Sequence, residues 1–164
     1  MRSFATDPRV LIIGYGNTLR GDDGLGRVVA VELGHTMDPS VVRVIDCHQL
    51  TPDLSEPLSK ARLAIFVDAR EGSPPGDIEC DKLTIESCNN SDLVHHLTPQ
   101  RLLAISKALY GSKPEAYAFS VGGEEWGYCE TLSPKVQAAV PVLIGWIERL
   151  IATTADHTIG ACHA

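Results

Sequence analysis

A glycine-rich segment, residues 14–26, constrains the fold of this chain more than any other part of the sequence. It reads Gly-Tyr-Gly-Asn-Thr-Leu-Arg-Gly-Asp-Asp-Gly-Leu-Gly, with five glycines and two adjacent carboxylates. The apolar run 10–13 precedes it and the amphipathic run 27–33 follows it, so we predict a loop between a buried strand and a helix. Glycine lets a backbone approach a ligand, and adjacent aspartates need a helix N-terminus, a cation or solvent to relieve their repulsion. We therefore expect chemistry at this loop.

The rest of the chain alternates between strand-like and helix-like segments. Thr98 and Ser133 each precede a proline, a typical helix start. Such alternation at short spacing predicts a three-layer α/β/α sandwich around a mostly parallel twisted sheet. Further strands are expected at 41–46, 63–68, 77–83 and 116–121, with 63–68 central and 77–83 at an edge, and further helices at 52–60, 98–109 and 133–151.

The length of 164 residues fits one domain that buries its core without disulfides or metal staples. We expect an N-terminal extension at 1–8, a single α/β domain at 9–152, and a flexible C-terminal tail at 153–164. The five cysteines include no C-x-x-C pair, so reduced thiols are expected.

Charge and hydropathy narrow the possible partners. The net charge of -7 argues against a general nucleic-acid or anionic-membrane binder. The N-terminus lacks the apolar core of a secretory signal, and the longest apolar window, 138–147, is far shorter than a membrane span and contains Pro141. We therefore expect a cytoplasmic protein with no nucleic-acid or membrane partner.

Carboxylates follow three of the predicted strands. Asp22 and Asp23 follow the first, Asp46 ends the second, and Asp68 ends the central strand. In open α/β sheets the ligand lies outside the carboxyl ends of the strands, where the strand order reverses. Asp22 alone is best explained as a cap of the following helix. Asp23 and Asp68 are the stronger ligand candidates as a pair, although Asp68 could also cap its own loop or pair with Arg70.

A dinucleotide site is the first alternative at the glycine-rich loop. Gly14 and Gly16 match the start of a G-x-G-x-x-G fingerprint, and Asp46 could bind a ribose. Leu19 stands where the third glycine is required. Acids at the helix start would also compete with a pyrophosphate for the same partial positive charge. The loop is therefore expected to attract a cation.

Histidines supply further candidates. His95 and His96 precede the predicted helix 98–109. Such a doublet is often an inert surface feature, but a neutral imidazole with two carboxylates suits nickel or zinc and leaves coordination positions open. Cys47 and His48 could form a nucleophilic dyad, which we discount because adjacent residues on an extended chain point to opposite faces. The sequence has no G-x-S-x-G elbow.

These residues resemble those of a known family. The loop from Gly14 to Gly26 resembles the G-x-G-N-x-L-x-x-D-(D/E)-G-x-G opening of the hydrogenase maturation proteases. These endopeptidases remove the C-terminal extension of the large subunit of nickel-iron hydrogenases after nickel insertion. The resemblance continues through Asp68, the His-Leu-Thr-Pro segment and Ser133-Pro134, and covers nearly the whole chain.

The resemblance implies roles for individual residues. The metal-binding and catalytic carboxylates fall on Asp23 and Asp68, and the histidine ligand on His95 or His96. The implied metal is nickel, that of the substrate precursor, and the implied partner is a hydrogenase large-subunit precursor, with the chain expected to be a monomer. Loop and structural roles fall on Gly14, Gly16, Asn17, Asp22 and Gly24.

Two other functional hypotheses remain beside the protease. A non-catalytic nickel-binding maturation chaperone would need the same ligands, so the sequence does not separate it from the protease. A nucleotide-binding α/β domain would be stabilised by nucleotide.

Overall fold

The fold is described by a computed structural model covering residues 8–85 and 97–160, with residues 156–160 described by their backbone alone. A five-stranded sheet has the strand order β2-β1-β3-β5-β4, in which every pairing is parallel except that of β4 with β5. The strands are β1 (Val10–Tyr15), β2 (Val42–Cys47), β3 (Leu63–Arg70), β4 (Ile78–Leu83) and β5 (Glu115–Gly122). The helices are α1 (Leu25–Thr36), α2 (Ser55–Lys60), α3 (Pro99–Tyr110) and α4 (Pro134–Gly160), with short 3-10 turns at Gly21–Gly24 and Pro52–Leu54.

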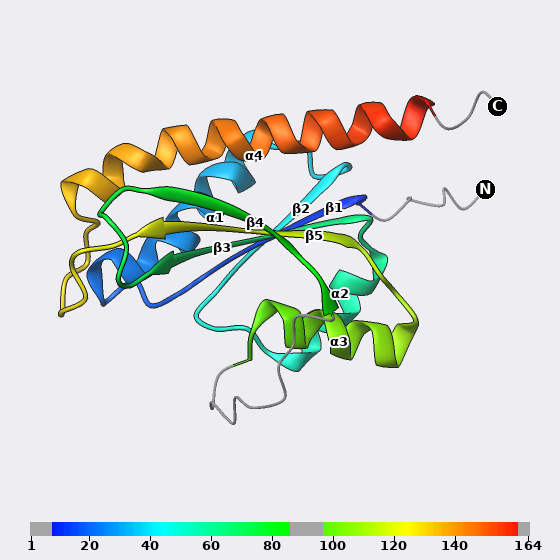
Figure 1. The fold of residues 1–164 in the computed structure, drawn as a ribbon, viewed down its shortest axis with the longest axis horizontal. Helices are drawn as coiled ribbons and strands as arrows, with labels where there is room; N and C mark the ends of the chain where they lie inside the picture. The colour runs from blue at the N-terminus through cyan, green and yellow to red at the C-terminus, as the bar shows by residue number, and fades with distance from the viewer. Residues whose placement is uncertain (1–7, 86–96, 161–164) are drawn as a thin grey trace.

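Helices cover both faces of the sheet, as Figure 1 shows. On one face α1 and α4 enclose a core that includes Ile12, Ile65 and Leu143. On the other face α2 and α3 enclose a second core that includes Ile13 and Phe66. The predicted three-layer sandwich is therefore confirmed.

Burial follows from the place of each strand in the sheet. Residues 63–67 of β3 are all at most 2% exposed, because neighbours on both sides and helices on both faces cover this central strand. In β4 the residues 79–82 are exposed, as expected for an edge strand. Both predicted placements are confirmed.

The helix signals of α3 work as the sequence predicts. The Thr98 hydroxyl accepts a hydrogen bond from the backbone N–H of Arg101 at 3.3 Å, Pro99 occupies the first turn, and Gly111 ends the helix.

Helix α4 is longer than predicted. It starts at Pro134 as expected, but it continues to Gly160 instead of ending near Ile151. The predicted tail therefore begins inside a helix, and residues 161–164 lie outside the described part of the chain. The hydroxyl groups of Thr153 and Thr154 donate hydrogen bonds to the carbonyls of Arg149 and Leu150, so these polar side chains are satisfied within the helix.

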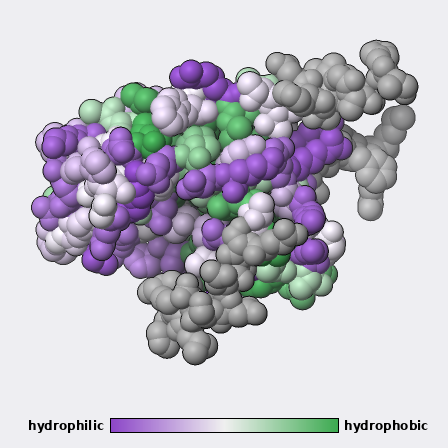
Figure 2. Space-filling model, viewed as in Figure 1, coloured by the Kyte–Doolittle hydropathy of each residue, from purple (hydrophilic) through white to green (hydrophobic). Residues whose placement is uncertain are grey.

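The stretch Pro134–Ala155 is long and apolar enough to cross a membrane by length and composition alone, a test that core helices also pass. One side of it is part of the core: Val136, Val140, Leu143 and Ile147 are at most 1% exposed. Other hydrophobic residues remain on the surface along α4, as Figure 2 shows; Val142 is 50% exposed. The helix is thus amphipathic within this fold.

The strand order creates a crevice between β1 and β3. From β1 the chain passes through α1 to β2 on one side, and then through α2 to β3 on the other side of β1. The order therefore reverses at β1, and the carboxyl ends of β1 and β3 form the place where α/β folds bind ligands. The glycine-rich loop leaves β1 at this end.

Candidate active site

Close packing at two glycines positions the glycine-rich loop. A Cβ atom at Gly26, in the first turn of α1, would overlap the carbonyl oxygens of Val67 and Tyr15. Gly16 has a φ of 139°, and a Cβ there would overlap the carbonyl of Asp23. The start of α1 therefore contacts the ends of β1 and β3 directly, and Asp23 is held against the turn at Gly16.

Asp23 is fixed by the backbone of this turn. Its Oδ2 accepts a hydrogen bond from the backbone N–H of Asn17 at 2.9 Å. The Asn17 side chain in turn accepts the N–H of Leu19 at 2.9 Å, an Asx-type contact that shapes the loop. Asp23 is half-buried and lines the crevice.

Asp68 lies near the end of β3 on the other side of the crevice. Its Oδ1 accepts the N–H of Ala69 at 2.8 Å. Burial raises the pKa of Asp68 to about 7, and the negative charge of Asp23 adds to the increase. The Ala69 N–H and the Tyr15 hydroxyl favour the ionised form and oppose this shift. Asp68 therefore changes its protonation near neutral pH.

Both carboxylates face one open cleft of about 710 Å³. Its lining comes from the glycine-rich loop, the segment after β2, the end of β3, and Leu97 and Arg101 at the start of α3. The lining residues are Tyr15, Gly16, Asn17, Arg20, Asp23, His48, Gln49, Leu50, Thr51, Pro52, Asp68, Leu97 and Arg101. Asp23 and Asp68, the predicted ligand pair, thus line the same cleft, and their roles stay a prediction.

Asp22 does not cap the helix that follows it, so that prediction is wrong. Neither the 3-10 turn Gly21–Gly24 nor α1 has a side-chain cap bond. Asp22 is fully buried, and its carboxylate instead accepts the N–H groups of Glu124, Glu125 and Ser133 and the Ser133 hydroxyl. Burial raises the pKa of Asp22, but these donors outweigh it and bring the pKa below its usual value. Asp22 joins the glycine-rich loop to the N-terminus of α4.

The predicted histidine ligands, His95 and His96, lie outside the described residues. Within residues 8–85 and 97–160 no group of three or more His, Cys, Asp or Glu side chains is arranged to hold a metal ion. His48 is exposed and lines the cleft. The described part of the chain thus contributes two carboxylates and one imidazole to the cleft.

The remaining candidates of the sequence have other surroundings. Cys47 packs against the core beside α2, and burial raises the pKa of its thiol, which disfavours a thiolate nucleophile. Asp46, the possible ribose ligand, forms an ion pair with Arg27 at 3.0 Å.

Among the cleft-lining residues that sequence reasoning missed are one tyrosine and two arginines, Tyr15, Arg20 and Arg101. For Tyr15 a signal existed. It follows Leu11 and Ile13 at a spacing of two along β1, and Asp68 follows Ala64 and Phe66 in the same way on the neighbouring strand. Both side chains therefore leave the same face of the sheet next to each other.

Solved structures of hydrogenase maturation proteases have the same fold as this chain. A nickel-iron hydrogenase maturation protease from Thermococcus kodakarensis KOD1 matches with a TM-score of 0.73 and 22% identity over 88% of this chain and 92% of that chain. A hydrogenase 2 maturation peptidase from a Thaumarchaeota archaeon matches with a TM-score of 0.66 and 26% identity, over 88% and 98% of the two chains.

A hydrogenase maturating endopeptidase from E. coli matches with a TM-score of 0.73 and 19% identity, over 89% and 93% of the two chains. No family model and no curated protein sequence matches the chain. The resemblance that the sequence indicates is therefore confirmed through the fold.

Proposed function

We propose that this chain, which has the fold of the hydrogenase maturation proteases, is an endopeptidase that removes the C-terminal extension of a nickel-iron hydrogenase large-subunit precursor after nickel insertion. The observation that carries the proposal is that Asp23 and Asp68 face one cleft at the point where the strand order reverses. The named functions of the structures with this fold support the reaction class.

In this proposal the nickel ion arrives with the precursor and is part of the substrate. Carboxylate and imidazole groups suit divalent nickel. Asp23 and Asp68 would bind it from two sides of the cleft, and His95 or His96 is proposed as the third ligand. Such binding would place a loaded precursor, and not an empty one, with its scissile peptide beside the carboxylates.

The chemistry proposed for Asp68 is general base and then general acid catalysis. In the metal-free protein the pKa of Asp68 is about 7. When one oxygen of this carboxylate binds nickel, the other oxygen would accept a proton from the attacking water. The water oxygen then forms a bond to the peptide carbonyl carbon. As the carbon–nitrogen bond breaks, Asp68 passes this proton to the leaving nitrogen. The new carboxylic acid then gives its remaining proton to the released amine or to solvent, so the products are a carboxylate and an extension with a free amino terminus.

In the decisive experiment the protein is incubated with nickel-loaded or nickel-free precursor, and the mass of the large subunit is then measured. We expect the loaded precursor alone to lose its extension. Asp23→Asn and Asp68→Asn should each lower the rate by at least about 100-fold, an effect typical of removing a proton-transfer group. Asp46→Asn is the matched control, because Asp46 also ends a strand but pairs with Arg27 outside the cleft lining.

Cleavage at the wild-type rate by both cleft variants would contradict the proposed roles. A precursor that binds in a nickel-dependent way but keeps its mass would instead support the non-catalytic chaperone. We further propose that the protein acts as a cytoplasmic monomer, which sedimentation and cell fractionation would test.

A further inference from the structure

Two segments distant in sequence meet at the rim of the cleft. Arg20 and Cys129 form a parallel bridge, in which the N–H of Gly21 donates to the carbonyl of Cys129 at 2.7 Å and the N–H of Cys129 to the carbonyl of Leu19 at 3.1 Å. The two segments therefore run next to each other at this bridge, where Leu19 directly precedes Arg20 and Tyr128 directly precedes Cys129.

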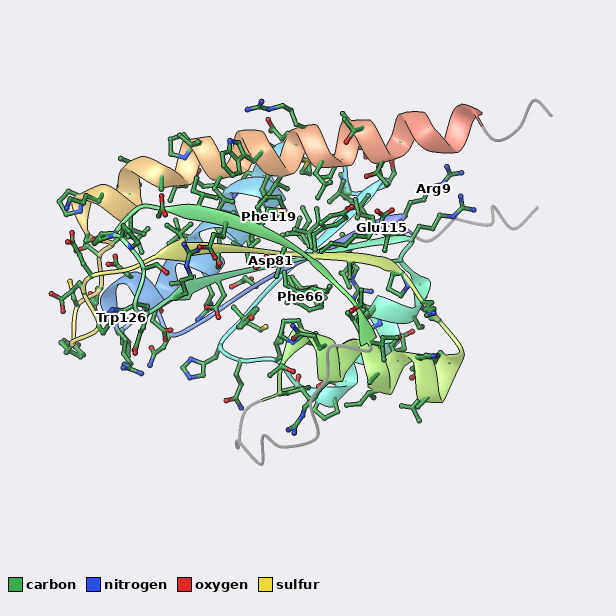
Figure 3. All side chains as sticks on the ribbon, viewed as in Figure 1. Arg9, Phe66, Asp81, Glu115, Phe119 and Trp126 are labelled. Carbon is green, nitrogen blue, oxygen red and sulfur yellow. The ribbon has the colours of Figure 1, made fainter. Side chains whose placement is uncertain are left out.

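The side chains of Leu19 and Tyr128 are exposed although they are apolar or aromatic. Leu19 is 47% exposed and Tyr128 is 83% exposed. Trp126 belongs to the same segment as Tyr128. Its carbonyl accepts a hydrogen bond from Arg20, its ring lies against Gly123, and part of its surface is exposed. We call Leu19, Trp126 and Tyr128 the rim ridge. Figure 3 shows Trp126 at the end of the molecule opposite Arg9 and Glu115, which is the end where the parallel strands finish.

The rim ridge is held by a buried network. The carboxylate of Asp22 binds the N–H groups of Glu124 and Glu125 at 2.9 Å each, and the N–H of Asp22 donates to the carbonyl of Glu125 at 2.9 Å. A surface fixed in this way loses little conformational entropy when a partner binds. The exposed apolar groups are thus presented in a preorganised arrangement.

The rim ridge is continuous with the cleft through Arg20. Arg20 follows Leu19 directly, lines the cleft, and donates from Nε to the carbonyl of Trp126 at 3.4 Å. A chain segment that enters the cleft beside Arg20 therefore brings the body of its protein close to the rim ridge.

We propose that the rim ridge is the docking surface for the folded body of the protein substrate, a contact that rests on the proposed function. Tyr and Trp dominate binding energy at protein interfaces. Glu124 and Glu130, which precede Trp126 and follow Tyr128 in the sequence, are both exposed. The partner surface is therefore an apolar recess bordered by lysine or arginine side chains.

The test compares Leu19→Ser and Tyr128→Ser with wild-type protein on nickel-loaded precursor. Matched controls are Leu109→Ser and Tyr110→Ser, because Leu109 is 66% and Tyr110 is 51% exposed. Both lie at the end of α3, just before β5 begins, and therefore at the end of the sheet opposite the cleft. We expect Tyr128→Ser to raise KM for the precursor about 10-fold and the pair Leu19→Ser/Tyr128→Ser more, with kcat unchanged. The controls should stay within about twofold of wild type.

A KM within about twofold of wild type for the double variant would overturn the docking surface and leave the cleavage reaction intact. If the wild type does not cleave the precursor, the proposed function fails. The dissociation constant of labelled precursor then tests separately whether the rim ridge binds it. A weaker complex of the precursor with Tyr128→Ser, but not with the control Tyr110→Ser, would support the rim ridge as the docking surface. Equal binding by Tyr128→Ser and wild type, or no binding by either, would overturn it.

Discussion

Ser133 is bound twice by the carboxylate of Asp22: its N–H donates to Oδ1 at 2.7 Å and its hydroxyl donates to Oδ2 at 2.9 Å. The pair connects the 3-10 turn before α1 to the first residue before α4. Within the described part of the chain, the donors to Asp22 come from the segment between β5 and α4. This carboxylate is therefore a structural centre next to the cleft, whereas its neighbour Asp23 faces the cleft itself.

Asp22→Asn should destabilise the protein by about 3 kcal/mol, because the amide brings donors toward groups that already donate and removes the charge that they bind. Urea unfolding of variant and wild type measures the change. Asp46→Asn, which breaks an exposed ion pair, should cost less than about 1 kcal/mol. Equal effects of the two substitutions would show that the buried network is not important for stability.

Asp68→Asn should stabilise the metal-free protein in a pH-dependent way. The folded-state pKa of about 7 lies above the ordinary value of 3.8, so the unfolded chain releases this proton first and stability falls as pH rises between these values. The variant lacks this loss. Its advantage in free energy of unfolding should grow from near zero at pH 4 to about 2 to 4 kcal/mol at pH 8. An advantage independent of pH would contradict the assigned pKa.

Gly26→Ala should destabilise the protein by about 2 to 4 kcal/mol, because the new methyl group meets backbone carbonyls of β1 and β3 that cannot move separately. Gly34→Ala lies in the same helix with open space around it and should stabilise by up to about 1 kcal/mol. Thermal unfolding of the two variants would settle the comparison. A stable Gly26→Ala protein would mean that α1 does not press against the strand ends.

Cys47→Ser should retain cleavage of the nickel-loaded precursor within about twofold of wild type, because burial raises the pKa of the Cys47 thiol and the side chain does not line the cleft. Iodoacetamide at neutral pH also reaches the exposed Cys80 and the half-exposed Cys129, so its effect on the rate is compared between wild type and Cys47→Ser and should be equal. Loss of activity in Cys47→Ser, together with an inactivation by iodoacetamide that leaves no residual rate in wild type, would point to thiol catalysis.

The elements and the acid pair could be predicted from local patterns. Continuous apolar runs identify β1 and β3, and Asp68 follows the second run directly, so the strand-end rule brings it near the glycine-rich loop. The start of α3 could also be predicted, because the capping hydrogen bond of Thr98 joins it to Arg101, which is only three residues away in the sequence.

The role of Asp22 could not be predicted in this way. Its nearest donors in the sequence are 102 residues away, so the pattern around it resembles an ordinary helix start. The length of α4 was hidden for a different reason, since Thr153 and Thr154 are typical of loops unless their hydroxyls bind the preceding turn. Tertiary contacts and compensating side-chain bonds decide such positions.

The hydrogen bonds between Asp22 and Ser133 can form only late in the synthesis of the chain. The two residues are 111 positions apart, so the ribosome must complete the helices α1 to α3 and the strands β1 to β5 before this bond can form. A nascent chain that ends before Ser133 has the strands that flank the cleft, but its glycine-rich loop lacks the Ser133 donors. The buried support of the glycine-rich loop is therefore completed later in translation than the synthesis of the residues that line the cleft, when α4 begins to emerge.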